Sequence, residues 1–119
     1  MSTCQYLDVS KNGDVTVVRF RQRHLLVDEG IVQSIGTELH ALANGNEGPK
    51  LIVDFVGVLD LSSLMLGKLV KLRTKMAANR GKLILCGLSP EVWEYLDETM
   101  LSQLFEIREA ESDALAALS

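Results

Sequence analysis

The chain has little of what most metal and redox sites are made from. It contains two cysteines and two histidines among 119 residues. Neither His24 nor His40 has a cysteine, aspartate or histidine at the spacing of a metal site, so we expect no metal and no cofactor. Cys4 and Cys86 make no metal site by themselves, and a reducing compartment disfavours a disulfide. We expect Cys86, in an apolar run, to be a small buried hydrophobe.

Positive charge and long apolar runs are also scarce. Twelve lysines and arginines stand against sixteen aspartates and glutamates, which gives a net charge of -4 and a pI near 5.1. Nonspecific nucleic-acid binding needs a basic surface, so this balance argues against it. No apolar run approaches the roughly 18 residues of a membrane span, and no secretory signal is visible. We therefore expect a cytoplasmic protein that binds neither nucleic acid nor membrane.

Motifs for catalysis are missing as well. The chain has no G-x-S-x-G nucleophile motif, no phosphate-binding P-loop and no G-x-G-x-x-G fingerprint. Asp54 and Asp60 have no defined geometry as a carboxylate pair, and we expect Asp54 near a strand end with its carboxylate bonded locally. Trp93, the single tryptophan, is expected to pack in the core. We do not expect an enzyme.

What is present is an alternation of strand-like and helix-like segments. Asn12-Gly13 between two β-rich segments predicts a hairpin. Ser89-Pro90 is typical of a helix start, and Ser112 is expected to cap the last helix. Residues 21–28 are expected to form a loop. Strands are predicted at 6–9, 15–20, 50–55, 82–86 and 104–108, and helices at 31–43 (closed by Asn44-Gly45), 63–79, 89–98 and 112–118.

Strands that are interleaved with crossover helices favour parallel pairing. A length of 119 residues suits one domain, and 47% hydrophobic with 24% charged residues is typical of a folded chain. We therefore predict a single α/β domain over residues 1–119. Its central sheet is mixed and mostly parallel, with about five strands, about four helices and an N-terminal antiparallel hairpin.

The most informative stretch is KLIVDFVGVLDLSSLMLG, residues 50–67. It combines a buried-type strand, a turn and two serines before a helix whose Met65 and Met76 fall on the core stripe. A serine at a helix N-terminus is either a cap or a place that receives a phosphate well. Either Ser62 or Ser63 could be the cap.

Three segments together resemble a STAS domain, the family of the bacterial anti-sigma factor antagonists. They are LIVDFVGVLDLSSLMLGKLVKL, RGKLILCGLSPEVWEYL and LSQLFEI, followed by an alanine- and leucine-rich end. The family motif at the start of the second helix is approximately D-S-[ST]-G-L-G. Leu66-Gly67 match its end and Ser63 matches the phosphorylated serine, whereas Ser62 replaces the aspartate and Met65 the glycine.

The resemblance implies a noncatalytic module that binds an anti-sigma factor, itself a serine kinase of the GHKL type. Phosphorylation of Ser63, with Ser62 as the alternative acceptor, would break the complex. A PP2C-type phosphatase is a further candidate partner. The expected contact positions are Asp60, Leu61, Ser62, Ser63, Leu64, Lys68 and Lys71.

Two other functions stay open. A constitutive STAS scaffold is favoured by the missing aspartate and glycine, and in that case Ser63→Ala and Ser63→Asp would not change binding. A small enzyme or ligand-binding domain would be supported by a deep polar pocket.

Overall fold

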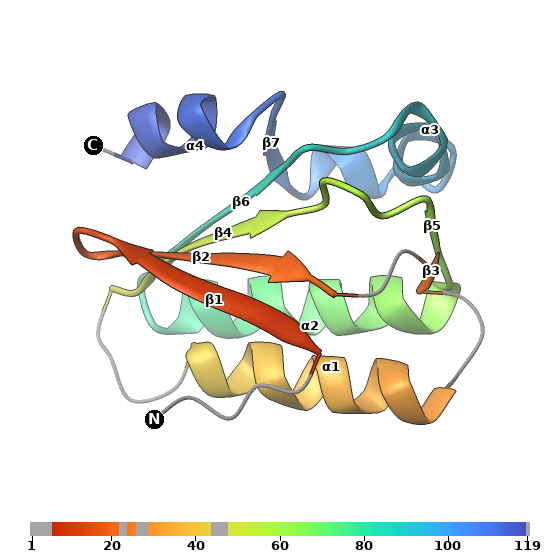
Figure 1. Cartoon of the computed structure of the whole chain (residues 1–119), viewed down its shortest axis with the longest axis horizontal. Coiled ribbons are helices and arrows are strands. Elements are labelled where there is room, and N and C mark those ends of the chain that lie inside the picture. The colour runs from red at the N-terminus through yellow and green to blue at the C-terminus, as the bar shows by residue number, and fades with distance from the viewer. Residues whose placement is uncertain (1–5, 22–23, 26–28, 44–47, 119) are drawn as a thin grey trace.

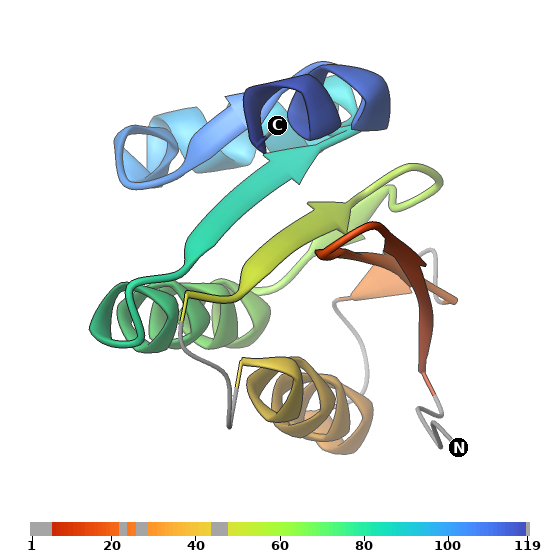
Figure 2. The same ribbon diagram turned by 90° about the vertical axis from the view of Figure 1, so that its left-hand side faces the viewer.

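The computed structural model describes residues 6–21, 24–25, 29–43 and 48–118. Helices α1 and α2 cover one face of a central sheet and α4 covers the other, while α3 lies beside the sheet (Figures 1 and 2). The strands are β1 (Leu7–Asn12), β2 (Val15–Phe20), β3 (His24–Leu25), β4 (Lys50–Asp54), β5 (Asp60–Leu61), β6 (Lys82–Cys86) and β7 (Glu106–Arg108). The helices are α1 (Glu29–Leu42), α2 (Ser63–Ala78), α3 (Pro90–Glu98) and α4 (Glu111–Leu118), with a 3-10 turn at Leu101–Gln103.

The main sheet confirms the predicted topology. Its five described strands follow the order β1-β2-β4-β6-β7, in which β1 and β2 are antiparallel and the other pairs are parallel. Ile52 at the centre of β4 pairs with Val17 on one side and with Ile84 on the other. All parallel strands therefore end at one edge of the sheet, and the loops toward β5, α3 and α4 leave from that carboxyl edge.

The core explains why β4 and β6 read as unbroken apolar runs, since both strands are covered on both faces. On one side the α2 stripe of Met65, Leu69, Leu72 and Met76 is fully buried against α1 and the sheet. On the other side α4 packs on a second cluster that includes Cys86. Both predicted core methionines and the buried cysteine are confirmed.

Several boundaries differ from the prediction. The expected loop at 21–28 contains β3, and β5 was not predicted; these two-residue strands pair with each other in parallel. β1 extends to Asn12, and the last strand begins at Glu106 because a 3-10 turn precedes it. Cys4 and the expected Asn44-Gly45 helix end lie outside the described residues.

The expected cap of the last helix is also wrong. α4 begins at Glu111, so Ser112 lies inside its first turn. The residue before the helix, Ala110, donates its backbone N–H to Asp113 Oδ2 at 3.2 Å. Asp113 thus reaches back to the helix start from inside the first turn, as in one half of a capping box.

None of the described helices has the length and apolar character required to cross a membrane.

The packing of α2 predicts opposite effects at two of its positions. Leu69→Ala removes a completely buried side chain and should lower the free energy of unfolding by about 2–5 kcal/mol. Gly67→Ala should raise it by about 1 kcal/mol, because a Cβ there meets no atom within 4 Å and alanine is the better helix former. Urea denaturation measures both. Equal destabilisation by the two substitutions would contradict this packing.

Candidate functional site

The turn after β4 determines where the two serines lie. Phe55 donates its N–H to Cys86 O at 2.8 Å, and Val58 closes the turn onto Phe55 O at 2.9 Å. Gly57 has a φ of 84°, a conformation that side-chain-bearing residues rarely adopt. Phe55 and Val58 are both buried and hold the turn against the core. The chain therefore enters β5 and α2 at the carboxyl edge of the sheet.

The two serines have different roles. Ser62 is the N-cap of α2: its Oγ accepts a hydrogen bond from the Met65 backbone N–H at 3.2 Å, and it is half-buried. Ser63 is the first residue of the helix and is exposed. Within the described part of the chain, no hydrogen bond is found for its hydroxyl. The structure thus assigns the cap, which the sequence left open between the two serines.

A shallow pocket of about 400 Å³ has Ser63 at its border. Residues of the β4–β5 turn, β5 and the start of α2 form one wall, and α3 forms the other. The lining residues are Leu59, Asp60, Leu61, Ser62, Ser63, Glu91, Val92 and Tyr95. The polar groups of this pocket, which we call the Ser63 pocket, are hydroxyls and the carboxylates of Asp60 and Glu91. It therefore combines apolar surface with negative charge.

The expected contact residues lie in three places. Asp60, Leu61, Ser62 and Ser63 all line the Ser63 pocket. Leu64 is partly buried against the core. Lys68 and Lys71 instead line a separate groove, between α1 and α2.

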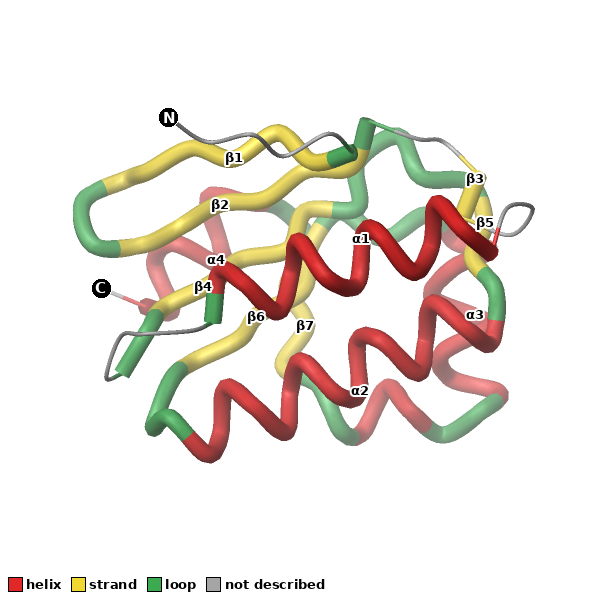
Figure 3. Tube along the Cα trace, turned by 90° about the horizontal axis from the view of Figure 1, so that it is seen from below, coloured by secondary structure: helices red, strands yellow, loops and turns green. Residues whose placement is uncertain are grey.

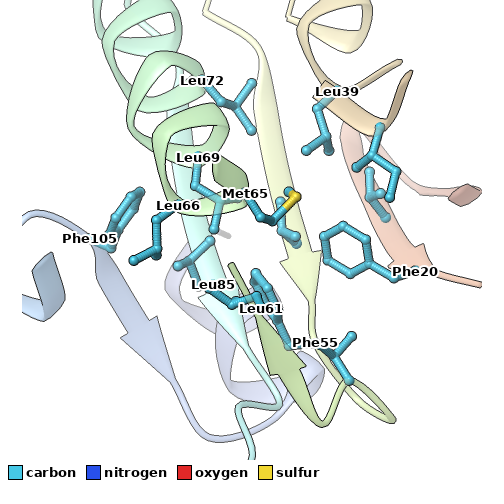
Figure 4. Packing of buried hydrophobic residues seen from close by; sticks show 14 of the residues in the cluster. Phe20, Leu39, Phe55, Leu61, Met65, Leu66, Leu69, Leu72, Leu85 and Phe105 are labelled. Carbon is cyan, nitrogen blue, oxygen red and sulfur yellow. The ribbon is translucent and has the colours of Figure 1, made fainter. Parts of the chain in front are cut away.

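Behind the pocket, Leu61 inserts into the core and ties β5 to the sheet. Figure 4 shows Leu61 beside Phe55 and Leu85, with Leu66 of α2 close to Phe105. Leu61 is 4% exposed, so it supports the pocket from beneath.

Sequence reasoning missed the contribution of α3. Glu91 and Tyr95 are one helical turn apart and therefore face the same pocket. Trp93, expected in the core, is 44% exposed and lines another depression with Leu88 and Ile107. The helical spacing of Glu91 and Tyr95 was a usable signal, but its value depended on knowing that α3 lies beside β5.

Asp54 is bonded locally, as predicted, and acts as an anchor. Its Oδ1 accepts a hydrogen bond from the Val56 backbone N–H at 3.0 Å, and its Oδ2 lies 3.2 Å from Arg19 Nε.

Burial, followed by the nearby Asp54 carboxylate, raises the pKa of Cys86 to about 12, so its thiol stays protonated at neutral pH. A protonated, buried thiol is a poor nucleophile, which leaves Cys86 a structural residue.

Comparison with known proteins identifies the family and solved structures of the same fold. A family model described as STAS domain matches residues 6–114. A STAS domain protein described as an anti-sigma-factor antagonist, from Planctomyces limnophilus, is 24% identical with a TM-score of 0.82, covering 93% of this chain and 96% of its own. An anti-sigma factor antagonist from Mycobacterium paratuberculosis is 21% identical with a TM-score of 0.77, and the match covers 93% of this chain and 91% of the other. The anti-sigma factor antagonist SpoIIAA in its unphosphorylated form is 17% identical with a TM-score of 0.68, and the match covers 94% of this chain and 96% of the other. Curated protein sequences give no significant match.

The different roles of the serines predict different effects on stability. Ser62→Ala removes the cap and should lower the free energy of unfolding by about 1 kcal/mol. Ser63→Ala, at an exposed position, should change it by less than about 0.5 kcal/mol. Thermal or urea unfolding of the two variants in parallel checks the assignment. The reverse order would make Ser63 the cap.

Proposed function

Because the chain belongs to the STAS domain family, we propose that it is a noncatalytic regulatory protein that binds an anti-sigma factor through the Ser63 pocket. The observation that carries the proposal is the exposed Ser63 at the start of α2, since Ser62 already provides the cap. The fold likeness to anti-sigma factor antagonists supports this choice of partner. The proposed module comprises residues 1–119, acts in the cytoplasm and needs no cofactor.

The surface around the pocket suits a protein partner. The described residues include five exposed large hydrophobic side chains, and one of them, Leu59, lines this pocket. Apolar surface with charged neighbours is the usual composition of an interface centre and its rim. Asp60 and Glu91 would favour basic side chains on the partner.

A phosphate on Ser63 would act on this interface. It adds a charge of about -1.5 to -2 and three acceptor oxygens. The free N–H groups and the positive end of the α2 dipole offset part of that charge within the domain. Glu91 borders the same pocket, so phosphate would add to the negative charge that Glu91 brings there. A partner that packs there would meet a bulky, strongly hydrated dianion.

The proposed kinase is the anti-sigma factor itself, of the GHKL type, and a PP2C-type phosphatase would reverse the modification. Two departures from the family motif have little effect on the surface that a kinase would meet. Ser62 replaces an aspartate, but both residues are good N-caps. Met65 replaces a glycine, but its side chain is completely buried. The acceptor position thus keeps its exposure despite the altered motif.

A constitutive scaffold is the second candidate. Leu64, which stands where the motif has a second hydroxyl, is partly buried against the core, so the chain offers one fewer exposed polar group beside Ser63. A scaffold would bind its partner through the same apolar surface without a switch.

Phosphorylation measured by intact mass separates these functions. With ATP and a candidate GHKL-type kinase from the same cell, one phosphate should appear on the native chain and on Ser62→Ala, and none on Ser63→Ala.

Ser63→Asp should weaken binding of the anti-sigma factor at least about tenfold, a loss of about 1.4 kcal/mol, while Ser63→Ala binds as the native chain does. Unchanged binding by both variants, with no phosphate added, would favour the scaffold. No binding to any anti-sigma factor would refute the proposal.

A further inference from the structure

The main sheet has an open edge at β7. This strand ends the strand order, so among the strands that the structure describes it has a neighbour, β6, on one side only. Figure 3 shows β7 and β1 at opposite ends of the sheet. The edge of a sheet presents main-chain N–H and C=O groups with which another strand can pair. Each edge of a sheet is therefore either protected or used.

Open space borders β7 on two sides. Toward α3, a hollow of about 560 Å³ is lined by Leu88, Trp93, Ile107, Arg108 and Glu109. Toward α4, a hollow of about 620 Å³ is lined by Ile107, Arg108, Glu109, Asp113, Ala116 and Ala117. The two hollows share the last two residues of β7 and the residue that follows them. A second strand laid along β7 therefore has room for side chains on both of its faces.

Exposed apolar side chains are concentrated beside this edge. Trp93, Met100 and Leu104 are three of the five exposed large hydrophobic residues that the structure describes, and they lie on α3 or between α3 and β7. The 3-10 turn in this segment contacts both α3 and β7, and Trp93 shares a hollow with Ile107. At the other edge, the described strands β1 and β2 contribute none of the five. Because tryptophan is enriched among the residues that dominate binding energy, β7 is the edge that suits an interface.

The charges of β7 form a self-complementary pattern. The register with β6 places Glu106 and Arg108 on the face that α4 covers, and Ile107 on the opposite face. Within one chain, Arg108 Nη2 lies 2.6 Å from Glu106 Oε2. When a second β7 runs antiparallel with the two Ile107 residues opposite each other, each glutamate faces an arginine of the other strand. Four charges of alternating sign then form a square, and no like charges lie directly opposite.

Arg108 also favours this strand over others. Its Nη1 donates a hydrogen bond to Ile107 O at 3.2 Å, so the guanidinium lies over a main-chain acceptor of β7. A charged side chain on an edge strand discourages pairing with arbitrary strands. A strand that brings a carboxylate opposite Arg108 compensates for the loss of that hydrogen bond. Glu106 of a second copy is such a carboxylate.

We infer that two copies of this chain pair through β7 in antiparallel orientation, so that one sheet runs through a two-fold symmetric dimer. A two-fold axis between the two Ile107 residues brings the same surface of each copy onto the other, as a closed dimer requires. Trp93 of both copies then lies on the same face of the joined sheet, beside the seam. A three-residue strand gives a small contact, so the dimer is weak and depends on concentration. Ser63 lines neither hollow, so the inference is independent of the proposed function.

Sedimentation velocity over a wide range of protein concentrations tests the proposal. The native chain should show a reversible equilibrium between monomer and dimer. Arg108→Glu and Glu106→Arg each place like charges opposite each other at both cross-strand positions, and each should weaken dimerisation at least about tenfold. Trp93 is the single tryptophan, so its fluorescence should shift to shorter wavelength as the dimer forms. A dimer that leaves this emission unchanged would contradict the proposed seam.

Rescue of the charge pattern separates pairing from folding. An equimolar mixture of Arg108→Glu and Glu106→Arg should form a mixed dimer about as tightly as the native chain does, because every cross-strand pair is again of opposite sign. The double variant Glu106→Arg with Arg108→Glu should dimerise by itself for the same reason. Lys11→Glu makes a matched charge reversal on β1 and should leave dimerisation unchanged.

Three results would overturn the inference. The first is a native chain that stays monomeric at every concentration. The second is equal dimerisation of the native chain and the two single variants, or loss of the dimer in Lys11→Glu alone, since either result places the contact elsewhere. The third is a mixture and a double variant that remain monomeric although both fold with the melting temperature of the native chain.

Discussion

The carboxylate of Asp54 is the constraint on which the carboxyl edge depends. It is 4% exposed, and a charge so far from water must be paired. It holds the turn through the Val56 N–H and reaches Arg19 at the end of β2, whose Nη2 lies 2.6 Å from Glu111 at the start of α4. One side chain thus links two strands, the turn toward β5 and the helix on the opposite face. A Cβ on Gly87, whose φ is 69°, would lie 2.4 Å from Asp54 Oδ1, so the next loop must also leave this space open.

Asp54 fixes the start of the segment that leads to Ser63, and each following contact fixes the next part of that segment. The buried Phe55 and Val58 fix the turn, Leu61 fixes β5, and Ser62 then starts α2 with its own hydroxyl. Each step leaves the next residue little freedom, and Ser63, the residue that follows the cap, is exposed to solvent. The exposure of Ser63 therefore results from the burial and capping that precede it. A phosphate there would meet solvent and a binding partner, and the core would lie beyond its reach.

Most of the fold could be predicted because strands and helices alternate with clear periodicity. The two-residue strands β3 and β5 could not, since they are too short to show a pattern and exist through pairing with each other. The wall of the Ser63 pocket that is formed by Asp60–Ser63 could be predicted, because these residues are consecutive in the sequence. Glu91 and Tyr95 come from α3, and only the tertiary arrangement brings them to the pocket. Trp93 was misassigned because a large aromatic at helical spacing suits a core and an exposed groove equally well.

The most consequential difference between sequence and structure is the division of α2 into two chemical surfaces. Ser63 faces a pocket bordered by the carboxylates of Asp60 and Glu91, whereas Lys68 and Lys71 face α1. Read along the chain, these residues form one cluster; in the structure they line two surfaces that share no residue. The proposed interface at Ser63 therefore requires no contact with Lys68 or Lys71.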